Sequence, residues 1–304
     1  MHLEAAASLW FAHLSRNFRS AYPKQAECLL RSHLIPALGS RPLLEIRKRD
    51  LITVIDCAAE RGPSNARHLF AYTRTFLNWC ASRDLIEHSP AAHISPTHLL
   101  GPAAFRTRIL SDSELSSIWH ACGALGQFGT IVRLLALTGQ RRGEVIGMRW
   151  SELSGLDEPG KAVWTIDAAR YKSAVPQRIP LSALAVRELA AIQRRSPLCF
   201  PSERKTSERP FSGVGKLLLR LNAMSGVEGW VLHDLRRTMR TGMARLGVPD
   251  EIAEACIGHG KRGLARVYNQ HRYEREMRDA FEQWAALVQE QKRPTGLQSR
   301  ERIR

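Results

Sequence analysis

The sequence predicts a mainly α-helical protein with one small β-sheet, an α+β fold divided into two domains. Apolar residues recur at three- and four-residue spacing over most of the chain, which is typical of amphipathic helices. Alternation of apolar and polar residues, which is typical of strands, is confined to residues 161–182. A chain of 304 residues can bury a substantial core, and this length favours two domains over one.

The first region, residues 1–88, predicts a bundle of short helices and no strand. Helical spacing runs through ASLWFAHL, AECLLRSHLI, DLITVIDCAA and ARHLFAYTRTFLNWCA, and turns fall at AYP, LGSRP and ERGPS. The pattern changes at residues 89–108, where Pro90, Pro96 and Pro102 interrupt any regular period. These prolines predict an extended linker, because a residue that precedes proline is disfavoured in the helical conformation.

The second region, residues 109–290, predicts helices around one β-hairpin. SDSE, at residues 111–114, is a capping box and predicts that a helix begins there. KAVWTIDAARYKSAVPQRIPLS alternates on both sides of a turn with a basic tip, which predicts the hairpin. Helices resume at LSALAVRELAAIQ, VGKLLLRLNAM and LHDLRRTMRTGMARLG, and an amphipathic helix covers about 273–289. We expect the basic tail at 291–304 to be flexible.

The charge of the chain is strongly positive, with 45 Lys and Arg against 29 Asp and Glu, a net charge of +16. A surplus spread over the whole chain favours a polyanionic partner, most often nucleic acid. No stretch approaches the roughly 18 consecutive apolar residues of a membrane helix, and no signal peptide opens the chain. We therefore expect a cytoplasmic, nucleoid-associated protein without a membrane partner. The six cysteines are scattered singly and predict reduced, buried thiols.

Two short segments place arginines at a turn or a helix start. In LTGQRRGEV, a turn at Thr138 leads into a helix that carries Arg141, and Glu144 follows three residues later, where its carboxylate can hold the guanidinium. In HDLRRTMR, His233 and Arg236 are three residues apart and share one helix face. Taken singly, each segment is better explained without a function, the first by an intrahelical ion pair and the second by a chance His-x-x-Arg.

Two more segments carry side chains that could act on a phosphate. Lys172 lies at the tip of the predicted hairpin, where a lysine alone is usually only solvated. The stretch GHGKRGLARVYNQHRYE contains His259 and two tyrosines, Tyr268 and Tyr273. The residue types alone do not tell which tyrosine would be the reactive one.

In this order and spacing, the four segments resemble the tyrosine recombinase family, in particular prophage and genomic-island integrases of the phage type. LTGQRRGEVIGMRW, RIPLS, HDLRRTMRTGMARLGV and VYNQH are similar to its catalytic domain. HLIPALGSRPLLEIRKRDL and FLNWCASRDLIEHSPA are similar to its helical, SAM-like core-binding domain. The resemblance covers nearly the whole chain and implies a DNA clamp made of a core-binding domain, residues 1–88, and a catalytic domain, residues 109–290. The N-terminal arm-binding domain common in this group is expected to be missing.

The resemblance implies that a group of side chains binds the scissile phosphate. Arg141 and Arg236 would clamp its non-bridging oxygens, and Glu144 would support this clamp. His233 would share in the clamp or in proton transfer, and His259 would form a hydrogen bond to the phosphate.

Two further residues would carry the exchange of bonds. Lys172 would be the general acid that protonates the leaving 5′ oxygen. Tyr268 would be the nucleophile, since it follows the histidine of the Gly-His motif at the distance typical of this family. Tyr273 is expected to pack or cap at the start of the last helix. Contacts to the DNA backbone are expected from four other arginines: Arg106, Arg108, Arg142 and Arg237.

The chemistry itself favours these residue types. Attack on a phosphodiester adds negative charge at the equatorial oxygens, and two planar guanidiniums match that geometry better than lysine would. With no Asp/Glu cluster of metal-binding form near these motifs, we predict a reaction without metal or other cofactor. A covalent 3′-phosphotyrosine conserves the energy of the broken bond, so strand joining needs no ATP, and the sequence has no GxxxxGK[ST] loop.

The implied partner is double-stranded DNA at attachment sites of a mobile element. Recombination joins two duplexes, so the resemblance implies a homotetramer on DNA in which the C-terminal helix docks on a neighbouring subunit. Packing of this helix on its own core is the alternative, and the sequence does not decide between the two. An excisionase and a host DNA-bending protein are further candidate partners. The target sequence, the cleavage spacing and the element served depend on base contacts that the sequence does not give.

Three alternatives explain part of the pattern. A type IB topoisomerase shares the tyrosine and arginine chemistry, although the helical first domain and the Gly-His motif favour a recombinase. A non-catalytic DNA-binding relic is disfavoured because all the expected catalytic positions are filled. A helix-turn-helix regulator built on DLRRTMRTGMARLGVPDEIAEACIG would leave the other segments unexplained.

Overall fold

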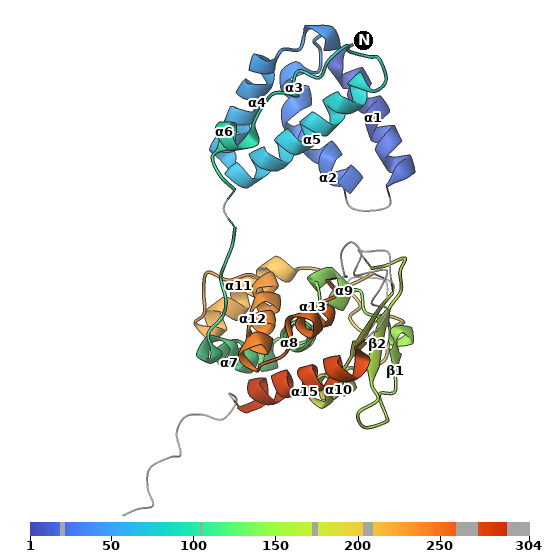
Figure 1. Cartoon of the computed structure of the whole chain (residues 1–304), viewed down its shortest axis with the longest axis vertical. Helices are drawn as coiled ribbons and strands as arrows, with labels where there is room; N and C mark the ends of the chain where they lie inside the picture. Colours follow the sequence, from blue (N-terminus) through green and yellow to red (C-terminus); the bar gives the residue numbers. More distant parts are fainter. Residues whose placement is uncertain (19–21, 104, 172–175, 203–208, 260–272, 291–304) are drawn as a thin grey trace, which may run out of the picture. The chain divides into compact units, whose positions relative to one another are not determined.

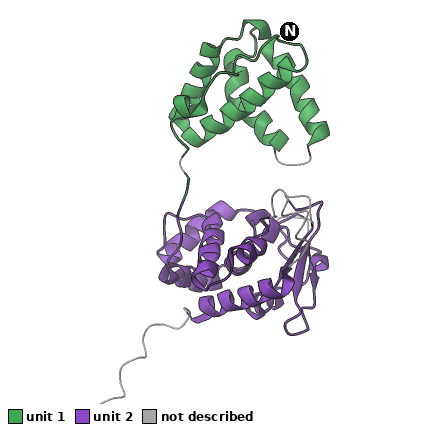
Figure 2. Ribbon diagram, viewed as in Figure 1, with its two compact units in different colours: residues 1–106 green, residues 107–304 purple. Residues whose placement is uncertain are grey.

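The computed structural model describes residues 1–18, 22–103, 105–171, 176–202, 209–259 and 273–290. The chain divides into two compact units, residues 1–106 and 107–304 (Figure 2). Helices dominate both units, and the described strands form one small antiparallel sheet (Figure 1). The prediction of a mainly helical α+β fold is confirmed.

Unit 1 is helical throughout its described residues and contains no β-strand there, as predicted. Its α-helices are α1 (Leu3–Asn17), α2 (Tyr22–Leu29), α3 (Ile35–Leu38), α4 (Lys48–Arg61), α5 (Pro63–Ala81) and α6 (Pro96–Leu100). A π-helical turn, Leu30–Leu34, joins α2 to α3. The apolar faces of these helices meet in one core, where the rings of Trp10 and Phe76 are 5.5 Å apart.

The segment 89–108, expected as an extended linker, is folded onto unit 1 over much of its length. Ala91 and Ile94 are buried in the core of this unit, and α6 follows them. Arg67 on α5 also donates a hydrogen bond of 2.6 Å to the carbonyl of Leu100. The prolines prevent a long helix here, but the apolar residues between them still gain stability by packing on unit 1. The sequence did not indicate this packing, because these apolar residues do not recur at a regular spacing.

Unit 2 combines helices with a three-stranded sheet that lies at one edge of the unit (Figure 1). The strands are β1 (Leu153–Ser154), β2 (Val163–Ile166) and β3 (Gln177–Pro180), in the order β1-β2-β3. The helices are α7 (Asp112–Ala121), α8 (Gly126–Thr138), α9 (Arg142–Ile146), α10 (Ala183–Ala190), α11 (Val214–Ser225), α12 (Leu232–Arg245), α13 (Asp250–Cys256) and α15 (Glu274–Glu290). The predicted hairpin is β2–β3, with Val163 paired to Pro180 and Ile166 to Gln177.

The predicted capping box opens α7. The hydroxyl of Ser111 accepts from the backbone N–H of Glu114 at 3.2 Å, and the carboxylate of Glu114 accepts from the backbone N–H of Ser111 at 2.8 Å. This reciprocal pair satisfies two N–H groups that a helix start leaves without partners in the helix.

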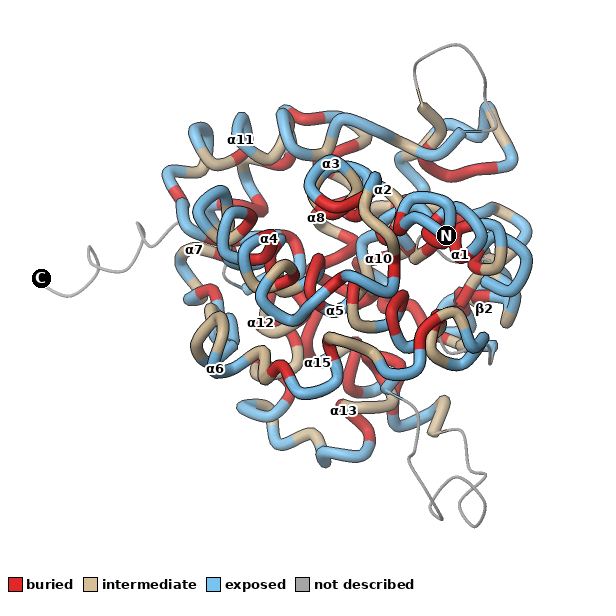
Figure 3. Tube along the Cα trace, turned by 90° about the horizontal axis from the view of Figure 1, so that it is seen from above, coloured by how far each residue is buried: buried red, intermediate tan, exposed pale blue. Residues whose placement is uncertain are grey.

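The core of unit 2 forms around α8, which is buried along most of its length, whereas α11 is largely exposed (Figure 3). Helices α10, α12 and α15 pack against α8. Gly242 on α12 allows a close approach, since a Cβ at this position would lie 2.1 Å from the ring of Trp284 on α15. The indole N–H of Trp284 donates to the carbonyl of Ala136 on α8 at 2.9 Å.

The apolar face of the C-terminal helix α15 packs on its own unit, and docking of this helix on a neighbouring subunit stays a prediction. Its buried side chains belong to the core of unit 2: Met277, Ala280, Phe281, Trp284, Ala285 and Val288. The amphipathic pattern predicted the helix correctly but could not say which surface its apolar face covers.

The cysteines are free thiols, and four of them are buried as expected. Burial raises the pKa of these four thiols to about 12: Cys80, Cys122, Cys199 and Cys256. Cys28 and Cys57 are exposed instead, because they lie on the outer faces of α2 and α4. Within the described part of the chain, no helix has the length and apolarity of a membrane span.

Candidate active site

Arg141 stands at the start of α9, directly after a sharp turn. Gly139 ends α8 in the left-handed conformation, with φ +59, and a Cβ there would lie 2.6 Å from the sulfur of Met239. Glu144 then accepts hydrogen bonds from the backbone N–H of Arg141 at 2.8 Å and from its Nη1 at 3.1 Å. The carboxylate of Glu144 is buried, so it fixes the guanidinium from the inner side of the helix.

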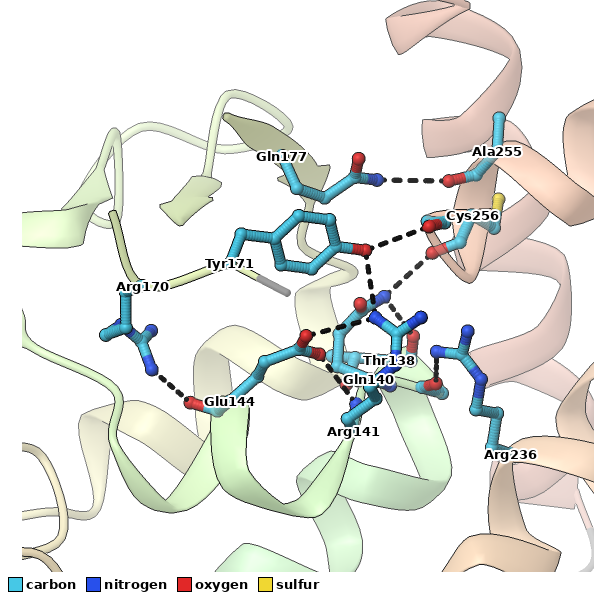
Figure 4. Close-up of polar contacts among 12 residues, drawn as sticks. Thr138, Gln140, Arg141, Glu144, Arg170, Tyr171, Gln177, Arg236, Ala255 and Cys256 are labelled. Carbon is cyan, nitrogen blue, oxygen red and sulfur yellow. Dashed lines mark hydrogen bonds and ion pairs between the residues drawn. The ribbon is translucent and has the colours of Figure 1, made fainter. Parts of the chain in front are cut away.

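Arg236, on α12, brings a second guanidinium to the same turn. Its side chain is only 5% exposed, and Nη1 donates to the carbonyl of Gly139 at 2.7 Å. Its Nη2 is buried and has no hydrogen-bond partner among the described residues. Figure 4 shows this guanidinium beside that of Arg141.

Electrostatics distinguish the two arginines. Burial and the positive charge of Arg141 lower the pKa of Arg236 to about 10. Burial acts to lower the pKa of Arg141 as well, but the hydrogen bond with Tyr171 and the charge of Glu144 raise it above the ordinary value. Both side chains remain cationic at neutral pH. A buried cation with an open N–H is costly to maintain without an anion, so this pair has the properties of a site for an anionic group.

His233 lies one helical turn before Arg236 on α12, with its ring exposed. Partial desolvation and the charges of Arg237 and Arg236 lower its pKa, so the ring is neutral at pH 7. Arg237 itself is tied back to the helix, since its Nη1 donates to the buried carboxylate of Asp234 at 2.6 Å.

His259 follows α13 and is held by a carboxylate of that helix. Its Nδ1 lies 2.6 Å from Oε2 of Glu254, which leaves Nε2 for another partner. Burial acts to raise the pKa of Glu254, but hydrogen bonds from Arg240 and His259 bring it below the ordinary value. Glu254 therefore stays ionised and fixes the orientation of the imidazole.

Tyr171 links the Arg141 turn to the end of α13. Its hydroxyl accepts from Nη1 of Arg141 at 3.3 Å and donates to the carbonyl of Gly258 at 3.0 Å (Figure 4). Two amides secure the same helix end: Gln140 donates to the carbonyl of Cys256 at 2.7 Å, and Gln177 donates to that of Ala255 at 3.1 Å (Figure 4).

The structure brings some of the expected site residues close together. Arg141, Glu144, Arg236 and His259 lie in one connected network of contacts, and His233 is on the face of α12 next to it. Lys172 and Tyr268 lie outside the described residues. No cluster of three or more His, Cys, Asp or Glu side chains that could hold a metal ion occurs in the described ranges.

The four arginines expected at the DNA backbone differ in their surroundings. Arg142 and Arg106 are exposed. The guanidinium of Arg108 is paired with the carboxylate of Glu114, and Arg237 is paired with Asp234 as described above. Their contact with DNA stays a prediction.

Comparison with known proteins gives the family. Residues 108–275 match the model of the phage integrase family, and residues 3–97 match that of the phage integrase central domain. The chain belongs to the phage integrase family. The resemblance noted in the sequence is thereby confirmed.

Two relatives within this family are prophage integrases of Escherichia coli K12. The chain is 28% identical to prophage integrase IntZ over 286 residues, which cover 92% of this chain and 69% of that protein. It is 25% identical to prophage integrase IntA over 268 residues, which cover 85% of this chain and 63% of that protein. The chain therefore spans only about two thirds of the length of either integrase.

Solved integrases share the fold at low identity. A lambda integrase dimer bound to a COC′ core site superposes with a TM-score of 0.68 at 18% identity, covering 86% of this chain and 96% of that chain. A lambda integrase tetramer bound to a Holliday junction gives 0.69 at 18% identity, covering 86% and 78%. The Tn1549 transposon integrase with circular intermediate DNA gives 0.67 at 15% identity, covering 89% and 96%.

Several residues that contact the candidate site were not found from the sequence. Tyr171, Gln140 and Gln177 act through backbone carbonyls, whose positions no sequence pattern reports. Glu254 offers a weak signal, since it is a carboxylate two residues before the end of α13 and five residues before His259.

Proposed function

We propose that this chain, a site-specific recombinase by its family, cleaves and rejoins DNA strands through a covalent 3′-phosphotyrosine at Tyr268. The observation that carries the proposal is the guanidinium of Arg236, which is buried with Nη2 unpartnered among the described residues, beside the guanidinium of Arg141. A scissile phosphate would accept hydrogen bonds from both groups. It would also remove the cost of keeping the buried charge unpaired.

The proposed step is an exchange of two P–O bonds. The phenol oxygen of Tyr268 attacks phosphorus and passes its proton to the neutral imidazole of His233, and the bond from phosphorus to the 5′ oxygen breaks. Lys172 supplies the proton that the leaving oxygen needs. In the transition state, extra negative charge on the equatorial oxygens faces Arg141 and Arg236, and electrostatic stabilisation of this kind is usually the largest catalytic contribution.

The two histidines complete the phosphate site. His233 is neutral at pH 7, so it can donate or accept a hydrogen bond and is suited to proton transfer. The Nδ1 of His259 is occupied by Glu254, so the phosphate would contact Nε2. Glu144 supports the clamp by holding both the backbone and the guanidinium of Arg141.

The bond energy is kept in the phosphotyrosine, so rejoining requires only a 5′ hydroxyl from a second strand. In this proposal the guanidiniums take the place that metal ions have in nucleases, and no cofactor is required. Activity in the presence of EDTA would test this part.

The proposed partner is duplex DNA at attachment sites, bound by both units as a clamp. The net charge of +16 supports this partner. Contacts to about six to ten phosphates give a log–log salt slope on the order of −5 to −9. Recombination between two duplexes requires a tetramer on DNA, in which α15 would contact a neighbouring subunit with surface other than the face already buried in unit 2. An excisionase or a host DNA-bending protein would act on this assembly in the cytoplasm, at the nucleoid.

A suicide substrate tests the function directly. Purified protein is incubated with EDTA and a nicked duplex from its own attachment region, and covalent adducts are resolved on a denaturing gel. We expect an adduct with the wild type and with Tyr273→Phe, but none with Tyr268→Phe. Tyr273 is the matched control, because its hydroxyl is engaged with Glu251 at 3.1 Å.

Other outcomes separate the alternatives. Bound DNA without an adduct would show a non-catalytic DNA-binding protein. Relaxation of supercoiled DNA by the monomer, without strand exchange between duplexes, would show topoisomerase activity. If the adduct disappeared with Tyr273→Phe and persisted with Tyr268→Phe, the nucleophile would be Tyr273 and the proposal would have named the wrong tyrosine.

A further inference from the structure

The phenol of Tyr171 is a buried polar group between two parts of the proposed phosphate site. It is 4% exposed, and the Cζ of Arg141 lies 5.5 Å from its ring centroid. Its hydroxyl donates to the carbonyl of Gly258 and accepts from Nη1 of Arg141. A phenol has one proton to donate, so this arrangement uses the hydroxyl both as donor and as acceptor. Phenylalanine would fill nearly the same volume, so what tyrosine adds at this position is the pair of hydrogen bonds made by its hydroxyl.

Gly258 is shaped to receive this hydroxyl. Its φ of +69 lies in the left-handed region, and a Cβ on it would lie 1.9 Å from the oxygen of Tyr171. Only glycine therefore meets both the backbone conformation and the close approach. Gly258 directly precedes His259, so the bond to its carbonyl fixes the backbone from which the imidazole projects.

The surrounding contacts determine which part Tyr171 controls. The turn at the end of α13 is already anchored through Gln140 and Gln177, and Arg141 is already anchored through Glu144. Loss of the phenol hydroxyl would leave each part folded. It would remove the hydrogen-bonded connection that keeps Arg141 and the turn before His259 in one geometry.

We propose that Tyr171 is a positioning residue that sets the guanidinium of Arg141 and the Gly258–His259 turn at a fixed separation for the scissile phosphate. The inference rests on the proposed function. Tyr171 is not a second nucleophile, because its oxygen is buried and both of its hydrogen bonds are made inside the protein.

The test uses Tyr171→Phe in the full chain, with Tyr273→Phe as the matched loss of a phenol hydroxyl elsewhere. Single-turnover adduct formation is measured over a range of concentrations of the nicked duplex. We expect the rate at saturating DNA to fall roughly 10- to 100-fold, as for a lost hydrogen bond to a charged group. The half-saturating DNA concentration should stay within about twofold, since few phosphate contacts change. Tyr273→Phe should match the wild type in both.

A second substrate links the defect to Arg141. A methylphosphonate at the scissile position carries one negative charge less, so the placement of a guanidinium matters less there. We expect the wild-type to Tyr171→Phe ratio of rates to be smaller on this substrate than on the phosphodiester. If neither the wild type nor Tyr171→Phe cleaves the methylphosphonate, the comparison of their rates on the phosphodiester alone decides whether the inference holds.

The outcomes are distinguishable from failure of the proposed function. No adduct with the wild type would refute the recombinase chemistry and, with it, this role. A wild-type adduct with Tyr171→Phe reacting at the same rate would overturn the inference alone. An equal loss of rate on both substrates would also overturn the inference. The same holds if Tyr171→Phe weakens DNA binding and lowers the unfolding temperature but leaves the rate at saturating DNA unchanged.

Discussion

Replacing Arg236 by methionine should make the protein more stable while it removes activity. The pKa of Arg236 falls well below the ordinary arginine value in the fold, to about 10. Neutral pH lies below both values, so the whole cost of keeping this guanidinium charged is present there. Each pH unit of difference corresponds to about 1.4 kcal/mol, which gives a cost of about 3 kcal/mol.

The substitution also loses one favourable contact. The hydrogen bond from the charged guanidinium of Arg236 to the carbonyl of Gly139 contributes about 1.5 to 3 kcal/mol. Methionine fills most of the space of the arginine stem and adapts to irregular cavities. The net gain is about 0 to 1.5 kcal/mol, which for a unit of this size raises Tm by up to about 6 °C.

The assay is thermal unfolding of the whole chain at pH 7 without DNA, followed by adduct formation on the nicked duplex. Arg133→Met is the matched control, because Arg133 is paired with Glu188 at 3.2 Å and with the carbonyl of Trp119 at 3.1 Å. We expect Arg133→Met to lower Tm. We expect Arg236→Met to raise Tm and to slow cleavage by about 100-fold or more.

A lower Tm for Arg236→Met, similar to that of Arg133→Met, would refute the reasoning. It would mean that the guanidinium of Arg236 contributes to the stability of the free protein, with its charge satisfied before DNA binds. Unchanged cleavage by Arg236→Met would refute its place in the phosphate clamp.

Three other predictions follow from single contacts. Gly242→Ala should lower the free energy of unfolding by about 3 kcal/mol or more, because the added Cβ would meet a buried indole ring. Gly215→Ala on exposed α11 should instead raise the free energy of unfolding by up to about 1 kcal/mol. Chemical denaturation measures both changes. The pKa of His233 is lower in the folded chain than in the unfolded chain, so the unfolded chain binds the proton more tightly. The free energy of unfolding therefore falls as the pH drops below 6.5 toward the pKa of His233 in the folded chain. His233→Gln should reduce this acid loss, measured as Tm at pH 5 and pH 7.5. Glu254→Gln should slow saturated cleavage about tenfold with unchanged half-saturation, because His259 loses its charged partner; equal rates would refute that support.

Local patterns in the sequence predicted the elements whose stability is itself local. The capping box at Ser111 opens α7 as expected, because its two hydrogen bonds join residues three positions apart. The alternation over 161–182 gave the β2–β3 hairpin for the same reason. The segment 89–108 was expected to be an extended linker, and its packing on unit 1 was not visible in the sequence, since it depends on contacts with α5 residues 20 and 33 positions earlier.

The candidate site divides in the same way. The identities and spacing of Arg141, Glu144, His233 and Arg236 were sufficient to indicate phosphate chemistry, because the motifs recur in the family. Neither the burial of Arg236 nor its pKa was visible in the sequence, since both depend on how α12 packs beside the turn after α8.

The sequence by itself determined the fold class, the family and most of the proposed catalytic residues, because short-range periodicity and ordered motifs are written along the chain. Only the tertiary structure decided that α15 covers its own unit and that Tyr171 connects Arg141 to the turn before His259. The physical reason is range: helix and turn preferences act within a few residues. Burial, close approach and hydrogen bonds to distant carbonyls exist only once separate segments pack together.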